Sequence, residues 1–218
     1  MGPVALFLMF SAGSYLLEPP PLPATPVPVP PAQSFVSPLL DPQQVNAAGS
    51  ITDPVSDIVP AADPELARMV AEVSSQNLQS YVINLERFGT RNTFSATDRD
   101  DFGIGAARRW IFNEFERVGN GRLQVEFQEY SFNYLGFGTQ QSNVVATLPG
   151  TGDYPGVLVM VANYDTALED LLDGETLNPG ADDNASGIAA LIEVARLMSS
   201  RSWNQTVIFL ASTAEEQG

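Results

Sequence analysis

The 218-residue sequence contains no cysteine, no histidine and no lysine. Without cysteine the chain can form no disulfide, no zinc finger and no thiol nucleophile. Without histidine it lacks the imidazole groups that commonly bind zinc in proteins. All ten basic residues are arginines, against 26 aspartates and glutamates, so the net charge is −16. This charge argues against nucleic-acid binding, which requires basic patches, and against adhesion to anionic membrane surfaces.

Basic residues are also missing from the N-terminal part of the chain, where the first arginine is Arg68. Residues 1–17 contain an apolar run of 15 residues from Pro3 to Leu17. This run is short for a membrane span and resembles an export signal or a clipped membrane anchor; an ordinary buried segment is the alternative. Residues 18–61 are rich in proline and are predicted to form a disordered linker. We therefore expect an exported protein (extracellular, periplasmic or membrane-anchored), with its N-terminus as a potential membrane tether.

The apolar pattern of the remaining chain predicts alternating helices and strands. Helices are predicted from Asp63-Pro64, from about Gln76 to Phe88 and from Ile104 to Val118. Strands are predicted at 123–127, 143–148, 156–162 and 206–212, with a buried helix at 187–198. The last strand, helix and strand form a right-handed parallel crossover, and both strands are apolar on both faces. We predict an α/β fold with three layers, in which helices cover both faces of a mixed, mainly parallel sheet.

Three short acidic motifs follow or separate the predicted central strands. They are Asn163-Tyr164-Asp165, Gly180-Ala181-Asp182-Asp183-Asn184 and Ala214-Glu215-Glu216-Gln217-Gly218. Ligands bind beyond the carboxyl ends of strands in α/β sheets, so all three motifs can meet at one edge. Carboxylates gathered there are costly unless a cation holds them together, and a metal pair is the simplest such cation. Taken singly, a loop, a helix cap and a solvated turn are the alternative interpretations.

The sequence PGADDNASG, followed by a buried strand and AEEQG, resembles the dizinc aminopeptidases of metallopeptidase family twenty-eight, clan MH. Their pattern is His-x-Asp, then Gly-Ala-Asp-Asp-Asn/Asp-x-Ser-Gly, then Glu-Glu-x-Gly. The resemblance extends over roughly 63–218, so residues 62–218 are interpreted as the N-terminal part of a zinc-peptidase domain. It implies the zinc aminopeptidase (phosphorylase/hydrolase-like) fold, incomplete at the C-terminus. It also implies two zinc ions and a peptide or protein substrate.

The resemblance assigns a role to each matching residue. Asp183 would bridge the two zinc ions, and Glu216 would bind one of them. Glu215 would be the catalytic general base acting on the bridging water, and Asp165 would orient a metal ligand. Asn163 occupies the place of the first histidine ligand. An amide oxygen is a poor zinc ligand beside imidazole, so the first zinc should be weakened.

The family's later aspartate and its distal histidine have no counterpart in this sequence. We therefore expect little or no stable dizinc binding, and no activity, from this chain alone. Two other functions remain open on the same scaffold. One is a non-catalytic binding or scaffolding domain, as in the transferrin-receptor ectodomain. The other is a related acyl-transfer or carboxypeptidase activity.

Overall fold

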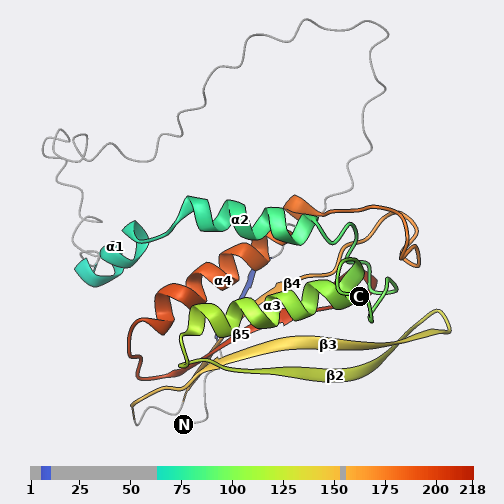
Figure 1. Cartoon of the computed structure of the whole chain (residues 1–218). Coiled ribbons are helices and arrows are strands. Elements are labelled where there is room, and N and C mark those ends of the chain that lie inside the picture. The colour runs from blue at the N-terminus through green and yellow to red at the C-terminus, as the bar shows by residue number, and fades with distance from the viewer. Residues whose placement is uncertain (1–5, 11–62, 153–155) are drawn as a thin grey trace, which may run out of the picture. The chain divides into compact units, whose positions relative to one another are not determined.

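A computed structural model describes residues 6–10, 63–152 and 156–218 of the chain (Figure 1). Five strands form one sheet in the order β1-β4-β5-β3-β2. The strands are β1 (Leu6–Phe10), β2 (Gln124–Tyr134), β3 (Phe137–Leu148), β4 (Val157–Asn163) and β5 (Thr206–Ser212). The helices among the described residues are α1 (Pro64–Ala71), α2 (Ser75–Glu86), α3 (Gly103–Gly119) and α4 (Ser186–Ser199). Short helical turns at Ala181–Ala185 and Glu215–Gln217 carry the second and third acidic motifs.

The strand directions confirm the predicted mixed α/β sheet. Strand β4 runs parallel to β1 and β5, while β3 runs antiparallel to β5 and β2. More of the strand pairs are antiparallel than expected, because β2 and β3 are joined by a tight hairpin rather than by a helical crossover. Leu135 and Gly136 make that turn with positive φ values of 50° and 90°, as primed hairpin turns require.

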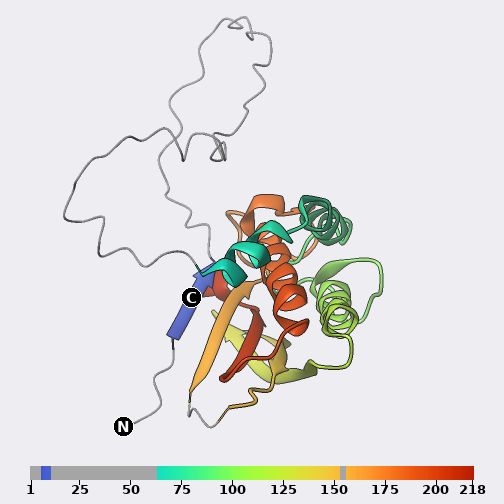
Figure 2. The same cartoon turned by 90° about the vertical axis from the view of Figure 1, so that its left-hand side faces the viewer.

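Helices α2, α3 and α4 lie on one side of the sheet (Figure 2). Helix α3 packs on β2 and β3, α4 packs on β4 and β5, and α2 packs on α4. The predicted second layer of helices on the other face is not found among the described residues. The single crossover β4–α4–β5 contributes one helix, which packs on one face of the sheet. The pleat of β4 and β5 turns Val159, Val161 and Ile208 to the opposite face, where they are half-buried.

Capping side chains define where the first two helices begin. The predicted start at Asp63 is confirmed, since Asp63 Oδ1 accepts a 2.8 Å hydrogen bond from the backbone N–H of Glu65. Ser74 caps α2, because its Oγ accepts a 3.1 Å hydrogen bond from the backbone N–H of Asn77. The second predicted helix therefore starts within one residue of its expected position.

Strand β1 lies within the predicted export segment 1–17 and pairs with β4 from Leu6↔Leu158 to Phe10↔Ala162. The rest of that segment, and the predicted linker 18–61, lie outside the described residues. Within the described part of the chain, no helix combines the length and apolar character needed to cross a membrane. The elements that build the site all belong to one compact unit of the chain.

Candidate metal centre

The carboxyl ends of β4 and β5 lie side by side, as the sequence predicts. The parallel register places Asn163 beside Ser212, the last residues of the two strands. One residue further on, the backbone N–H of Tyr164 donates a 2.9 Å hydrogen bond to the carbonyl of Ser212. The first and third acidic motifs therefore leave the sheet at the same edge.

Asp165 joins the first motif to the third. Its Oδ2 accepts a 3.1 Å hydrogen bond from the backbone N–H of Glu216 and a 3.4 Å hydrogen bond from Thr93 Oγ1. The side chain is completely buried. Burial raises the pKa of Asp165 to about 6, although backbone hydrogen bonds oppose this shift. A carboxylate held in this way fixes the turn that carries Glu215 and Glu216.

The two neighbouring glutamates differ in exposure, as expected for adjacent residues. Glu215 is exposed to solvent, whereas Glu216 is half-buried. Burial and, after it, the charges of Asp183, Asp165 and Glu215 together raise the pKa of Glu216 to about 7. The charges of all three neighbouring carboxylates thus oppose the ionisation of Glu216. Such a group of carboxylates gains when a cation enters, because the cation removes their mutual repulsion.

Asn163 is buried, and its amide oxygen is already engaged. Asn163 Oδ1 accepts a 2.7 Å hydrogen bond from Asn184 Nδ2. Asn184 Oδ1 in turn accepts a 3.0 Å hydrogen bond from the backbone N–H of Gly187 in the first turn of α4. Asn163 Nδ2 is buried and has no hydrogen-bond partner among the described residues. The one metal-binding atom of Asn163 therefore joins the end of β4 to the start of α4 instead.

The donor set was tested against the pair of zinc ions that the resemblance implies. In the part of the chain that the structure describes, no group of three or more aspartate, glutamate, histidine or cysteine side chains can hold a metal ion. Zinc usually takes at least three protein ligands, with nitrogen or sulfur among them. The described residues therefore do not complete a zinc pair.

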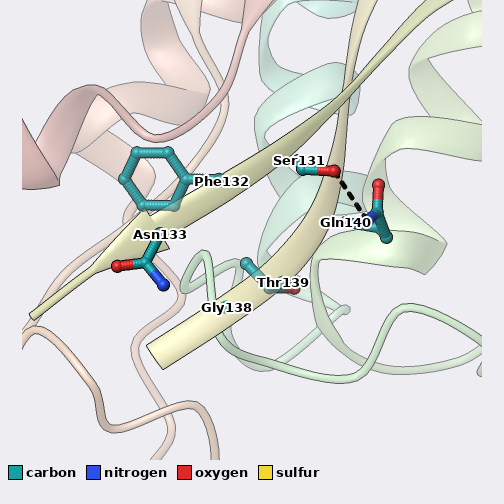
Figure 3. Close-up of a pocket in the computed structure, with 6 residues that line it drawn as sticks. All are labelled: Ser131, Phe132, Asn133, Gly138, Thr139 and Gln140. Atoms are coloured by element: carbon teal, nitrogen blue, oxygen red, sulfur yellow. Dashed lines mark hydrogen bonds between the residues drawn. The ribbon is translucent and has the colours of Figure 1, made fainter. Parts of the chain in front are cut away.

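The β2–β3 ribbon borders this edge of the sheet. Only residues 144–148 of β3 pair with β5, so the rest of the ribbon continues past Ser212. Tyr130 Oη donates a 3.0 Å hydrogen bond to the carbonyl of Thr213, which anchors the ribbon beside the site. A pocket of about 460 Å³ lies further along the ribbon, and Figure 3 shows the residues that line it. It is lined by Ser131, Phe132, Asn133, Gly138, Thr139 and Gln140, with a 2.9 Å hydrogen bond from Gln140 Nε2 to Ser131 Oγ. No carboxylate lines this pocket, so it is distinct from the predicted site.

Arg91 is the residue at this site that sequence reasoning missed. It is fully buried in the loop between α2 and α3, and its guanidinium reaches the loops that carry Asp165 and Asp183. The resemblance included the segment Arg87-Phe88-Gly89-Thr90-Arg91, but no periodic pattern marks a buried arginine in a loop. The sequence feature that could have pointed to Arg91 was the need for a cation beside several buried carboxylates.

Three comparisons place the chain among known proteins. Residues 143–218 match the model described as Peptidase family M28. A protein of Leptosphaeria maculans named "Probable zinc metalloprotease" is 39% identical over 165 residues, which cover 73% of this chain and 38% of that protein. A protein of the same name from Pyrenophora tritici-repentis is 37% identical over 180 residues, covering 79% of this chain and 37% of that protein. The chain thus spans little more than a third of the length of these curated relatives.

Solved structures agree with the fold. LapB from Legionella pneumophila aligns with a TM-score of 0.56 at 21% identity, covering 85% of this chain and 47% of that one. A Zn-dependent exopeptidase from Parabacteroides distasonis gives 0.54 at 22% identity, covering 67% and 48%. A glutaminyl cyclase from Fimbriiglobus ruber gives 0.53 at 20% identity, covering 66% and 46%. At these identities the likeness extends to the fold alone.

Proposed function

This chain belongs to peptidase family M28, and we propose that it forms part of a zinc-dependent exopeptidase, specifically an aminopeptidase. The substrate would be a peptide or protein with a free N-terminus. One observation carries this proposal: Asp165 accepts a hydrogen bond from the backbone N–H of Glu216, while Asn163 accepts one from Asn184. Three motifs that are distant in the sequence thereby meet at one sheet edge.

Each acidic residue has a separate role in the proposed enzyme. Asp183 and Glu216 are the metal-binding carboxylates, and Asn163 holds a degenerate ligand position. Asp165 orients the residues around it through its hydrogen bond to the backbone of Glu216. Glu215 is the general base, and its exposure leaves its carboxylate free to accept a proton from the attacking water.

We propose that the 218-residue chain by itself is inactive. It has no histidine, and the amide oxygen of Asn163 is hydrogen-bonded to Asn184. The same observation favours a second candidate, in which the protein keeps the peptidase fold as a non-catalytic binding or scaffolding domain. The hydrogen-bonded amide pair supports this second candidate because it needs no metal to hold the loops.

An activity and metal assay distinguishes the two candidates. We would express the chain together with any residues that follow Gly218 in its gene, and measure zinc content and release of N-terminal residues from peptides. The aminopeptidase proposal requires activity that disappears in Glu215→Gln. Inactive protein that gains activity only after Asn163→His would instead support the non-catalytic domain. Acyl transfer, as in the glutaminyl cyclases of similar fold, would appear as cyclisation of N-terminal glutamine in the same assay.

We also propose that the protein is exported, on the basis of residues 1–17. Residues Leu6–Phe10 cannot be both a cleaved export signal and strand β1, because cleavage would remove them from the sheet. Fractionation of the expressing cells tests export, and the N-terminal sequence of the exported protein tests cleavage. Protein found only in the cytosol would contradict the export proposal.

A further inference from the structure

Arg91 makes an unusual set of contacts for a fully buried side chain. Its Nε donates a 2.7 Å hydrogen bond to the carbonyl of Tyr164. Nη1 donates to the carbonyls of Leu85 at 3.3 Å and Pro179 at 2.5 Å, and Nη2 donates to the carbonyl of Gly180 at 2.9 Å. All four acceptors are main-chain carbonyls, so these hydrogen bonds satisfy the guanidinium without neutralising its charge.

These contacts connect the two loops that carry the proposed metal-binding region. Tyr164 directly precedes Asp165, and Gly180 opens the turn that contains Asp183. The backbone adds to the connection, because the Arg91 N–H donates to Thr166 Oγ1 at 3.0 Å and its carbonyl accepts from the Thr166 N–H at 3.2 Å. Arg91 thus fixes the loop after β4 against the loop before α4.

The charge of Arg91 also acts on the carboxylates of the site. Burial lowers the pKa of Arg91 to about 10, and Asp165, Glu86 and Asp183 oppose this shift in that order. A buried guanidinium costs several kcal/mol unless nearby dipoles and anions compensate it. Asp165 and Asp183 are two of these three anions, and both also oppose the ionisation of Glu216.

We propose that Arg91 is a positioning residue, an internal counter-cation that holds the Asp165 and Asp183 loops together in the absence of metal. The importance of these loops rests on the proposed function, but the coupling between Arg91 and the carboxylates does not. The competing explanation is a neutral structural role, in which the guanidinium only ties main-chain carbonyls together. The two explanations differ in whether Arg91 senses the charge at position 183.

A double-mutant cycle on the full 218-residue chain separates these explanations. We would measure the Tm of the native chain, Arg91→Met, Asp183→Asn and the double variant. A counter-cation predicts that Asp183→Asn is less harmful, or stabilising, once Arg91 is replaced, with a departure from additivity of at least about 3 °C. When Arg91→Lys takes the place of Arg91→Met in the cycle, the departure from additivity should be small, because lysine keeps the positive charge. Additive effects would overturn the proposal.

Arg122 provides the matched control. Its Nη1 also donates to two main-chain carbonyls at the C-terminal end of α4, those of Ser199 at 2.6 Å and Arg201 at 2.5 Å. Arg122→Met combined with Asp183→Asn should be additive. If Arg91→Met does not fold, the Arg91→Met/Asp183→Asn double variant should fold, because the neutral amide no longer needs the cation. Failure of both to fold while Arg122→Met folds would overturn the proposal.

The cycle is independent of enzymatic activity. If Arg91 and Asp183 are coupled but the protein has no peptidase activity, the counter-cation proposal stands and only the peptidase proposal fails. If the protein is an active peptidase but the two residues are not coupled, the counter-cation proposal fails and the peptidase proposal stands.

Discussion

Asn184 Nδ2 donates a 2.7 Å hydrogen bond to Asn163 Oδ1 in the buried space between the end of β4 and the start of α4. Since Asn184 also accepts from the backbone of Gly187, the pair forms a continuous polar link from strand to helix. The link occupies the position where the resemblance expects a metal–histidine contact. The polar link thus ties the end of β4 to the start of α4.

The stability of this link can be measured by removing its acceptor. Asn163→Ala should lower the free energy of unfolding by about 1–3 kcal/mol, because Asn184 Nδ2 loses this partner in a buried place. Gln128→Ala is the matched control, since it removes an exposed amide–amide hydrogen bond of 2.9 Å to Asn143. The control should cost less than about 0.5 kcal/mol in the same denaturant titration. Equal losses would show that the buried link has no special weight.

Gly180 is predicted to tolerate no side chain. It has a φ of 51°, and a Cβ there would overlap Thr166 and the carbonyl oxygen of Asp183. Gly180→Ala should therefore destabilise the chain by more than about 2 kcal/mol through strain and overpacking. Gly121→Ala shares the positive φ, at 77°, but meets nothing within 4 Å and should cost only about 1 kcal/mol. Similar losses in the two variants would show that the loop before α4 can move aside.

Glu193 is predicted to make stability depend on pH in the acidic range. It is 2% exposed and pairs with Arg196 at 2.7 Å. Burial opposes its charge, but hydrogen bonds from Arg196, the Ser74 N–H and Asn77 outweigh burial and lower the pKa of Glu193. Since the folded pKa lies below the unfolded one, this contribution is complete above the unfolded pKa and is lost as pH falls through the folded pKa. Glu193→Gln should lower stability at neutral pH by about 2 kcal/mol and flatten the loss on acidification.

The control for Glu193 is a similar pair on the surface. Glu114 pairs with Arg117 at 2.6 Å, but the Arg117 side chain is 58% exposed. Glu114→Gln should change stability by less than about 1 kcal/mol at neutral pH. An unchanged acid profile in Glu193→Gln would contradict the assignment of the pH dependence to Glu193.

The two faces of β5 should respond differently to polar substitution. Val207 is 2% exposed and faces the helices, whereas its neighbour Ile208 is half-buried on the other face. Val207→Thr should cost about 2 kcal/mol, because it buries a hydroxyl group. Ile208→Thr should cost less than about 1 kcal/mol and reduce binding of a hydrophobic dye by the chain. A large loss for Ile208→Thr would show that this face is also covered.

The sequence predicted those helices and strands whose buried faces require apolar residues at regular spacing. The apolar runs ending at Ala162 and Ser212 and the helix between them could be placed because their side chains face a core. Parallel strands meet at their carboxyl ends, so the convergence of Asp165 with Glu216 followed from topology. The extension of β3 back to Phe137 was missed, because that half of the strand pairs only with β2 and its buried residues, Gln141 and Ser142, are polar.

Other features depend on contacts that no local pattern encodes. The pairing of Asn163 with Asn184 joins residues 21 positions apart, and either amide alone is an ordinary polar loop residue. The role of Arg91 depends on carbonyls of Tyr164 and Gly180, more than 70 positions away. Main-chain carbonyls carry no residue identity, so the sequence cannot indicate which side chain they will bind.

We propose that residue 163 and Asp183 belong to one incomplete metal position, and a zinc titration of the Asn163→His chain is the decisive test. The Asn163→His variant should bind zinc at least about tenfold more tightly than the native chain, with a zinc-dependent rise in Tm. The gain should vanish when Asp183→Asn is added and persist when the exposed neighbour is changed by Asp182→Asn. Zinc affinity that is unchanged by Asn163→His, or a gain that survives Asp183→Asn, would contradict the account.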